Sequence, residues 1–152
     1  KDFTEKYTKL FLDDLEKLNI AQADNVIPVT TLIPEMVRMI QTMLNRKNAY
    51  LADDGSIYFS VKSFKKYGRL ANLDMKGMKE SVRIDNDEYD KDSAADFVLW
   101  KGWKEADGEN FWNETFTVEG KEITIKGRPG WHIECSACNM KYFGAQIDIH
   151  MG

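Results

Sequence analysis

The segment 127–138 constrains the fold more than any other part of the sequence. Two glycines and a proline fall within positions 127–130, between a stretch of alternating apolar residues and a stretch of helix-forming composition. Glycine lacks a Cβ and proline lacks an amide hydrogen, so this cluster predicts a turn. We expect a helix to follow as far as Gly144, and then a short strand over residues 146–150. The order strand, turn, helix, strand is typical of α/β nucleotide-binding folds.

Two stretches before residue 46 have apolar side chains spaced by three and four positions, which predicts amphipathic helices. The first covers residues 3–18. The second begins after Thr31, whose hydroxyl is expected to cap it, and it has Pro34 and Glu35 in its first turn. The residues between the two helices are mostly polar and predict a connecting link.

The rest of the chain before the turn has the two-residue alternation of strands. Residues 49–61 and 115–126 each have turn-forming residues near their middle and predict β-hairpins. Residues 97–101 predict a further strand, and the acidic segment 85–92 is expected to be a solvated loop. Helices followed by hairpins indicate an α+β unit that leads into the α/β segment.

Composition excludes several classes of protein. The 152 residues include only two cysteines, three positions apart, which cannot form a disulfide framework. This cysteine usage favours a reducing, cytoplasmic setting. No apolar run is long enough to span a membrane, so we expect no membrane partner. A formal net charge of −4 argues against a uniformly basic nucleic-acid module, but not against a larger enzyme that docks RNA mainly through other parts. Because the chain lacks an initiator methionine and stops abruptly after His150, it is expected to be a fragment.

Reactive side chains gather near the end of the chain. Cys135 and Cys138 are either two buried thiols, a redox pair, or a residue pair in which Cys135 is one ligand of a zinc site completed elsewhere. His132 and His150 are the only histidines, and each is either a core residue or part of a site. Trp131 is either a packing anchor or a substrate contact at the mouth of a crevice.

A small basic cluster also lies in the middle of the chain. Lys62, Lys65, Lys66 and Arg69 have aromatic residues between them, so they form either a solvated face or a contact for a phosphate backbone. The chain has neither a P-loop nor a dinucleotide-binding glycine motif. From residue types alone, the sequence predicts part of an α/β ligand site that includes a metal ligand as one alternative.

Three segments resemble the cysteinyl-tRNA synthetase family. Residues 127–137, Gly-Arg-Pro-Gly-Trp-His-Ile-Glu-Cys-Ser-Ala, resemble the signature of the second half of that family's catalytic domain. Residues 148–152, Asp-Ile-His-Met-Gly, are similar to the start of its D-I-H-x-G-G element, and residues 96–101 are similar to its D-F-A-L-W-K segment. The resemblance extends over nearly the whole chain.

This resemblance implies a class I synthetase whose Rossmann-type catalytic domain is split by an insertion. Residues 1–19 would close the first half of the nucleotide fold, residues 20–127 would form the α+β connective insertion, and residues 128–152 would begin the second half. Such enzymes use ATP, with magnesium, to convert cysteine to cysteinyl-adenylate, and then transfer the cysteinyl group to tRNA(Cys).

The resemblance also implies roles for individual residues. Cys135 matches one of four zinc ligands, the others lying outside this chain, and Trp131 matches the residue that rearranges over the bound cysteine. His132 and His150 match catalytic histidines at the floor of the site. Cys138 stands where the family often has Met, which favours a packing role.

Two other functions remain open from the sequence. A ligase on the same scaffold would activate cysteine and transfer it to an amino-sugar acceptor. A non-catalytic α+β binding or redox module would use Cys135 and Cys138 directly. Because the ATP motifs and the other zinc ligands of the family are absent, residues 1–152 alone are expected to be inactive.

Overall fold

The computed structural model describes residues 2–72 and 95–151. The acidic segment 85–92, expected to be a loop, lies outside these residues. In the described residues we find no helix that is both long and apolar enough to cross a membrane. The first helix, α1, spans Asp2–Lys17 and confirms the helix predicted for residues 3–18.

Five strands form one sheet that is antiparallel throughout. They are β1 (Ala49–Leu51), β2 (Ile57–Phe59), β3 (Phe97–Gly102), β4 (Trp112–Val118) and β5 (Lys121–Pro129). Their order in the sheet is β1-β2-β3-β5-β4, so β3 joins the two hairpins that the sequence predicted. The described chain is therefore an α+β structure, because no pair of its strands is parallel.

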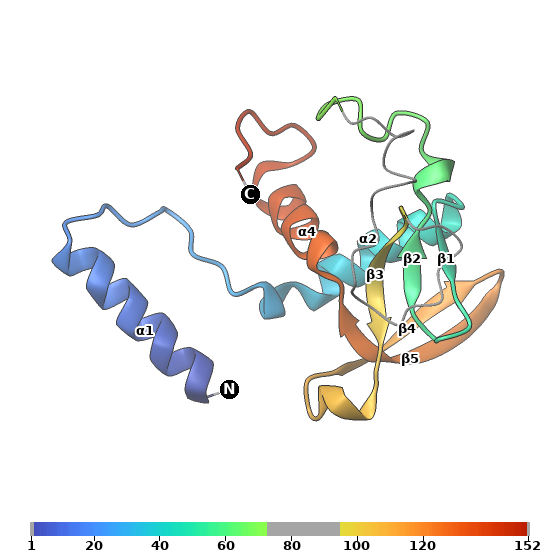
Figure 1. The fold of residues 1–152 in the computed structure, drawn as a ribbon, viewed down its shortest axis with the longest axis horizontal. Helices are drawn as coiled ribbons and strands as arrows, with labels where there is room; N and C mark the ends of the chain where they lie inside the picture. The colour runs from blue at the N-terminus through green and yellow to red at the C-terminus, as the bar shows by residue number, and fades with distance from the viewer. Residues whose placement is uncertain (1, 73–94, 152) are drawn as a thin grey trace.

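The two helices α2 (Ile33–Asn45) and α4 (Trp131–Phe143) pack against each other and against the sheet (Figure 1). The apolar stripe of α2 enters the core, where Met36 and Ile40 are fully buried. Trp100 on β3 is also fully buried, with its ring edge-on to that of Phe116 at a centroid separation of 5.6 Å. These contacts fix where α4, and hence the segment richest in reactive side chains, lies on the sheet.

α1 lies apart from this packed unit and is joined to it by an extended link (Figure 1). Most of its large apolar side chains remain in solvent: Phe3, Tyr7, Leu10 and Phe11 are all exposed. Short 3₁₀ turns complete the described structure at Val29–Leu32, Val61–Ser63 and Glu105–Asp107.

The predicted turn at residues 127–130 is wrong in most of its length. β5 continues through Gly127 to Pro129, which pair with Gly102 and Trp100 of β3. Only Gly130 separates strand from helix, and its amide donates to the carbonyl of Leu99 at 2.9 Å. The sequence rule failed because glycine here allows two strands to approach closely, rather than allowing a bend.

Two smaller predictions are also wrong. Residues 146–150 form no strand, because they pair with no strand in the described part of the chain. Thr31 does not cap α2: its hydroxyl donates to the carbonyl of Pro28 at 2.7 Å, within a 3₁₀ turn that precedes the helix.

A parallel Rossmann-type sheet is not present in the described residues, and β5 crosses the boundary expected between residues 127 and 128. The division into domains therefore stays a prediction.

Candidate functional site

The start of α4 is held against β3 by close backbone contact. The helix begins at Trp131, directly after Gly130, which has extended backbone angles of φ −75° and ψ 152°. A Cβ at Gly130 would clash with the carbonyl of Val98, so only glycine fits between this helix start and the strand. The side chains of the first turn of α4 are thereby placed beside β3, the central strand of the sheet.

α4 has one buried face and one open face. Ile133 and Ala137, four positions apart, are each 1% exposed and belong to the core. Trp131 is 81% exposed, and His132 and Cys135 are also exposed. Helical spacing thus turns the apolar residues of the segment inward and its chemically reactive residues outward.

The open face of α4 lines a hollow of about 750 Å³, which we call the Cys135 hollow. α4 lines it together with the segment that follows the helix, from Gly144 to His150. All four site residues proposed from the sequence line it: Trp131, His132, Cys135 and His150. The fold therefore brings His150 to the same hollow as Trp131, His132 and Cys135, although the end of α4 and the loop after it separate them in the sequence.

Short contacts orient both histidines. The His132 ring meets the Phe97 ring edge-on, with centroids 4.9 Å apart. The Asn139 side-chain amide nitrogen lies 3.3 Å from Nδ1 of His150. If that amide donates to Nδ1, the ring proton is on Nε2, which leaves Nε2 as a hydrogen-bond donor.

The two cysteines lie in different surroundings. Cys135 is exposed and lines the Cys135 hollow, whereas Cys138 is half-buried and packs against the core cluster. Both are free thiols. The geometry gives the C-x-x-C pair no common site, in keeping with a packing role for Cys138.

The described side chains do not include a complete set of metal ligands. Within residues 2–72 and 95–151, no group of three or more His, Cys, Asp or Glu side chains could hold a metal ion. A structural zinc ion needs four ligands, so these residues do not by themselves form a zinc site. No step through a metal ion follows from them.

Glu134 lies within the reactive segment but outside the Cys135 hollow. It lines a separate hollow of about 160 Å³ together with Arg128 and Trp112. Burial raises the pKa of Glu134, and the nearby charge of Arg128 opposes that rise. The sequence grouped Glu134 with its neighbours, but the helix turns it to the other side.

Among the residues of the Cys135 hollow that sequence reasoning missed are Asn139, Phe97 and Tyr67. Asn139 carried a usable signal, because it lies four positions after Cys135 and seven after His132, on the same helical face. Phe97 and Tyr67 come from distant parts of the chain, and no local pattern links them to α4.

Comparison with known proteins identifies the class. The family model described as the class I (C) tRNA synthetase catalytic domain matches residues 1–152. The chain therefore belongs to the class I tRNA synthetases of this catalytic-domain family.

The similar curated proteins are named cysteine–tRNA ligase, an aminoacyl-tRNA synthetase. Those of Koribacter versatilis, Brachyspira hyodysenteriae and Chlamydia pneumoniae are 46%, 44% and 42% identical to this chain. The alignments cover 100%, 99% and 100% of this chain, but only 29%, 30% and 31% of those relatives. The chain thus spans about a third of the length of the curated relatives it matches.

Proposed function

We propose that this chain is a section of the catalytic region of a cysteine–tRNA ligase, and that the Cys135 hollow is part of its cysteine site. One observation carries the proposal. Trp131, His132, Cys135 and His150 come from a helix and from the segment after it, yet all four line the same hollow. The enzyme would activate cysteine with ATP and magnesium as cysteinyl-adenylate, and would transfer the cysteinyl group to tRNA(Cys).

Cys135 would provide one ligand to a zinc ion whose other ligands lie outside the described residues. Its exposed thiol at the hollow makes it available for such a role, and Cys138 is not. When bound, zinc would select cysteine over serine, because a soft thiolate is a much better zinc ligand than a hydroxyl. A pocket that relied on shape would discriminate poorly between side chains of such similar size.

The remaining side chains would orient the substrate. The Trp131 ring, almost wholly exposed at the hollow, offers an apolar surface to a small bound amino acid. His132 is held by Phe97, and His150 is held by Asn139, so each can present a ring nitrogen in a fixed direction. Hydrogen bonds from these rings would stabilise negative charge on the reacting carboxylate or phosphate oxygens.

These proposed residue roles predict that residues 1–152 alone do not activate cysteine. The chain lacks a phosphate-binding glycine motif, and its described residues do not complete a zinc site. The phosphoryl chemistry needs groups that hold ATP and the metal together. A test of function therefore requires the full-length protein.

The test compares Cys135→Ser with the matched control Cys138→Ser in the full-length enzyme. We expect Cys135→Ser to lower kcat/KM for cysteine by at least about 100-fold in ATP–pyrophosphate exchange, because it removes a metal ligand. Cys138→Ser should change it by no more than a few-fold, and zinc content measured on both proteins should fall only for Cys135→Ser. Near-normal exchange by Cys135→Ser would remove this residue from the cysteine site.

A further inference from the structure

β4 lies at one edge of the sheet and has β5 as its only strand partner in the described part of the chain. Its seven residues, Trp112–Val118, include one charged side chain, Glu114. In an antiparallel ladder, successive residues direct their backbone groups alternately toward and away from the neighbouring strand. An edge strand of this length therefore presents amide and carbonyl groups to which a strand of another molecule can bond.

At one position of β4, a side chain takes the place of the missing strand. The Thr117 amide donates to Oε1 of Gln41 at 2.8 Å, and Nε2 of Gln41 donates to the Thr117 carbonyl at 2.9 Å. This side-chain amide therefore forms the same pair of hydrogen bonds with Thr117 that a residue of an antiparallel neighbour would form. Because both bonds go to α2, Thr117 is one of the residues of β4 that direct their backbone groups away from β5.

α2 holds the Gln41 side chain in this position. Gln41 is half-buried on α2, and this helix packs against β4. Nε2 of Gln41 also donates to Oδ1 of Asn45, one turn further along the helix, at 2.8 Å. Both amide hydrogens and the amide oxygen of Gln41 thus have partners, which fixes the orientation of the group.

The other outward positions of β4 are open. By the same alternation, Asn113 and Thr115 direct their backbone groups away from β5, as Thr117 does. Within residues 2–72 and 95–151, no strand pairs with these groups, and no loop backbone bonds to them. The side chain of Gln41 therefore closes the outer edge of β4 at one end only.

The sequence of β4 is complementary to itself in one antiparallel register. Pairing of two copies about a twofold axis at Thr115 places Asn113 opposite Thr117. It also places Glu114 opposite Phe116, so no like charges face each other. Thr117 belongs to both outer hydrogen-bonded pairs of this register, and it is the residue whose backbone is already bonded to α2.

We propose that Gln41 acts as a latch that closes the edge of β4 against pairing with a second copy of the protein. The latch occupies the outward amide and carbonyl of Thr117, so the self-paired register loses its outer hydrogen bonds. Native sheets commonly protect an edge strand with charged residues, and β4 has only Glu114 for that purpose. The latch is independent of the proposed function of the Cys135 hollow.

The experiment measures the mass of the full-length protein by light scattering during size-exclusion chromatography, over a series of protein concentrations. Gln41→Ala should raise the apparent mass toward about twice that of wild type, because an isologous contact closes after two copies. Alanine is a good helix former, so this change preserves α2.

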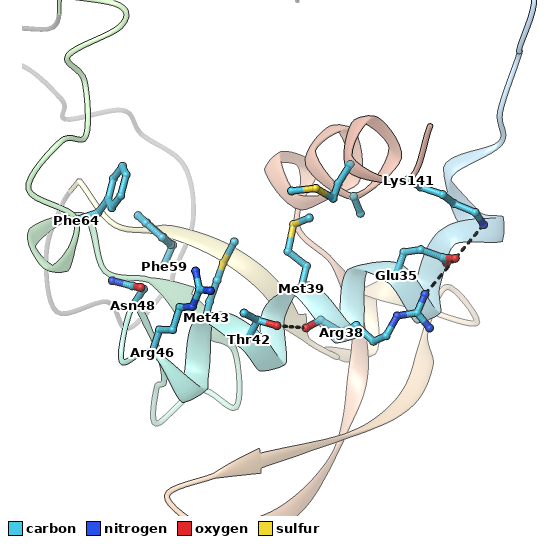
Figure 2. Close-up of a pocket in the computed structure, with 12 residues that line it drawn as sticks. Glu35, Arg38, Met39, Thr42, Met43, Arg46, Asn48, Phe59, Phe64 and Lys141 are labelled. Carbon is cyan, nitrogen blue, oxygen red and sulfur yellow. Dashed lines mark hydrogen bonds and ion pairs between the residues drawn. The ribbon is translucent and has the colours of Figure 1, made fainter. Parts of the chain in front are cut away.

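Thr42→Ala is the matched control. Thr42 is the next residue of α2 and lines a hollow of about 710 Å³ along that helix. Its hydroxyl donates within α2, to the Arg38 carbonyl at 2.9 Å, rather than to a strand (Figure 2). Thr42→Ala should therefore leave the mass equal to that of wild type.

A second substitution separates strand pairing from a loss of folding. Thr115→Lys places like charges opposite each other at the centre of the self-paired register, so the double variant Gln41→Ala/Thr115→Lys should return to the wild-type mass. Association that persists in the double variant would show that another surface is responsible, and would overturn the inference. Association of Thr42→Ala to the same extent would do so as well, as would an unchanged mass of Gln41→Ala at every concentration.

Discussion

α1 and α2 arise from the same kind of sequence pattern and lie in opposite surroundings. Each has apolar side chains at helical spacing, and each is a helix in the structure. Ile40 of α2 is completely buried, whereas Phe11 of α1 is 62% exposed. Periodicity therefore predicts that a helix forms and which of its faces is apolar, but not what covers that face.

The energetic consequence differs accordingly. Full burial of a large apolar side chain contributes roughly 1.5–3 kcal/mol, so α2 is stabilised mainly by tertiary packing. The apolar face of α1 gains little of this energy in the described structure, although most of the stability of helices in proteins comes from such packing. The comparison predicts that substitutions in the packed unit have large effects and that those in α1 have small ones.

The largest effect is expected for Ile40→Ala. This change removes a buried side chain and leaves a cavity between α2 and the sheet, which should lower the free energy of unfolding by about 2–5 kcal/mol. Denaturant unfolding followed by tryptophan fluorescence measures it, since all four tryptophans lie outside α1. A loss below about 0.5 kcal/mol would show that α2 is no better packed than α1, and would break the comparison.

Gly127→Ala tests the packed unit in the opposite way, by adding a methyl group. A Cβ at this position would lie 2.7 Å from Nε1 of the buried Trp100 and would clash with the carbonyl of Lys101. Separating β3 from β5 to make room should lower the free energy of unfolding by roughly 1–3 kcal/mol. An unchanged unfolding curve would mean that the two strands are not so closely apposed.

The same position shows where sequence reasoning reached its limit. Local turn chemistry correctly predicted the hairpin between β4 and β5, because Glu119 and Gly120 both have positive φ, at 51° and 79°. The course of β5 through Pro129 depends on its pairing with β3, which is distant in the sequence. No local pattern distinguishes a glycine that bends the chain from one that allows two strands to meet.

The candidate site, too, could be predicted from the sequence only in part. Trp131, His132 and Cys135 lie on one helix, and the family resemblance of the amino-acid sequence is enough to connect them with His150. Their arrangement around one hollow required the return of the chain after Gly144, and Phe97 and Tyr67 entered only through the sheet and the loop beside it. Residues on one element can be grouped by spacing, whereas those from different elements require the tertiary fold.

A smaller effect is expected for Glu35→Gln, which links α2 to α4. The hydrogen bond from Lys141, with a further contribution from the backbone, lowers the pKa of Glu35 below its ordinary value of 4.5. The charged form is therefore favoured by folding, so this stabilisation is present above pH 4.5 and is lost as the pH falls through the lowered pKa. Glu35→Gln should lower the unfolding midpoint near neutral pH and flatten its fall in acid.

Lys17→Gln on α1 is the matched control for that change. Lys17 also pairs with a carboxylate, Asp14 at 3.0 Å, but both residues belong to the same exposed helix. The hydrogen bond and charge of Asp14 raise the pKa of Lys17 above 10.5, so Lys17 stays protonated throughout the acid range. Because both partners lie on α1, apart from the packed unit, removal of Lys17 should leave the acid branch of the midpoint curve parallel to that of wild type. An acid branch of Glu35→Gln identical to that of wild type would show that the contact between α2 and α4 contributes nothing.

The smallest effect is expected for Leu10→Ala, the counterpart of Ile40→Ala in α1. Leu10 is exposed, so its truncation leaves no cavity, and alanine is at least as good a helix former. The free energy of unfolding of residues 1–152 should change by less than about 0.5 kcal/mol, and helix content by far-ultraviolet circular dichroism should be retained. A loss above about 1 kcal/mol would mean that the apolar face of α1 is covered in solution, and α1 and α2 would then differ in partner rather than in burial.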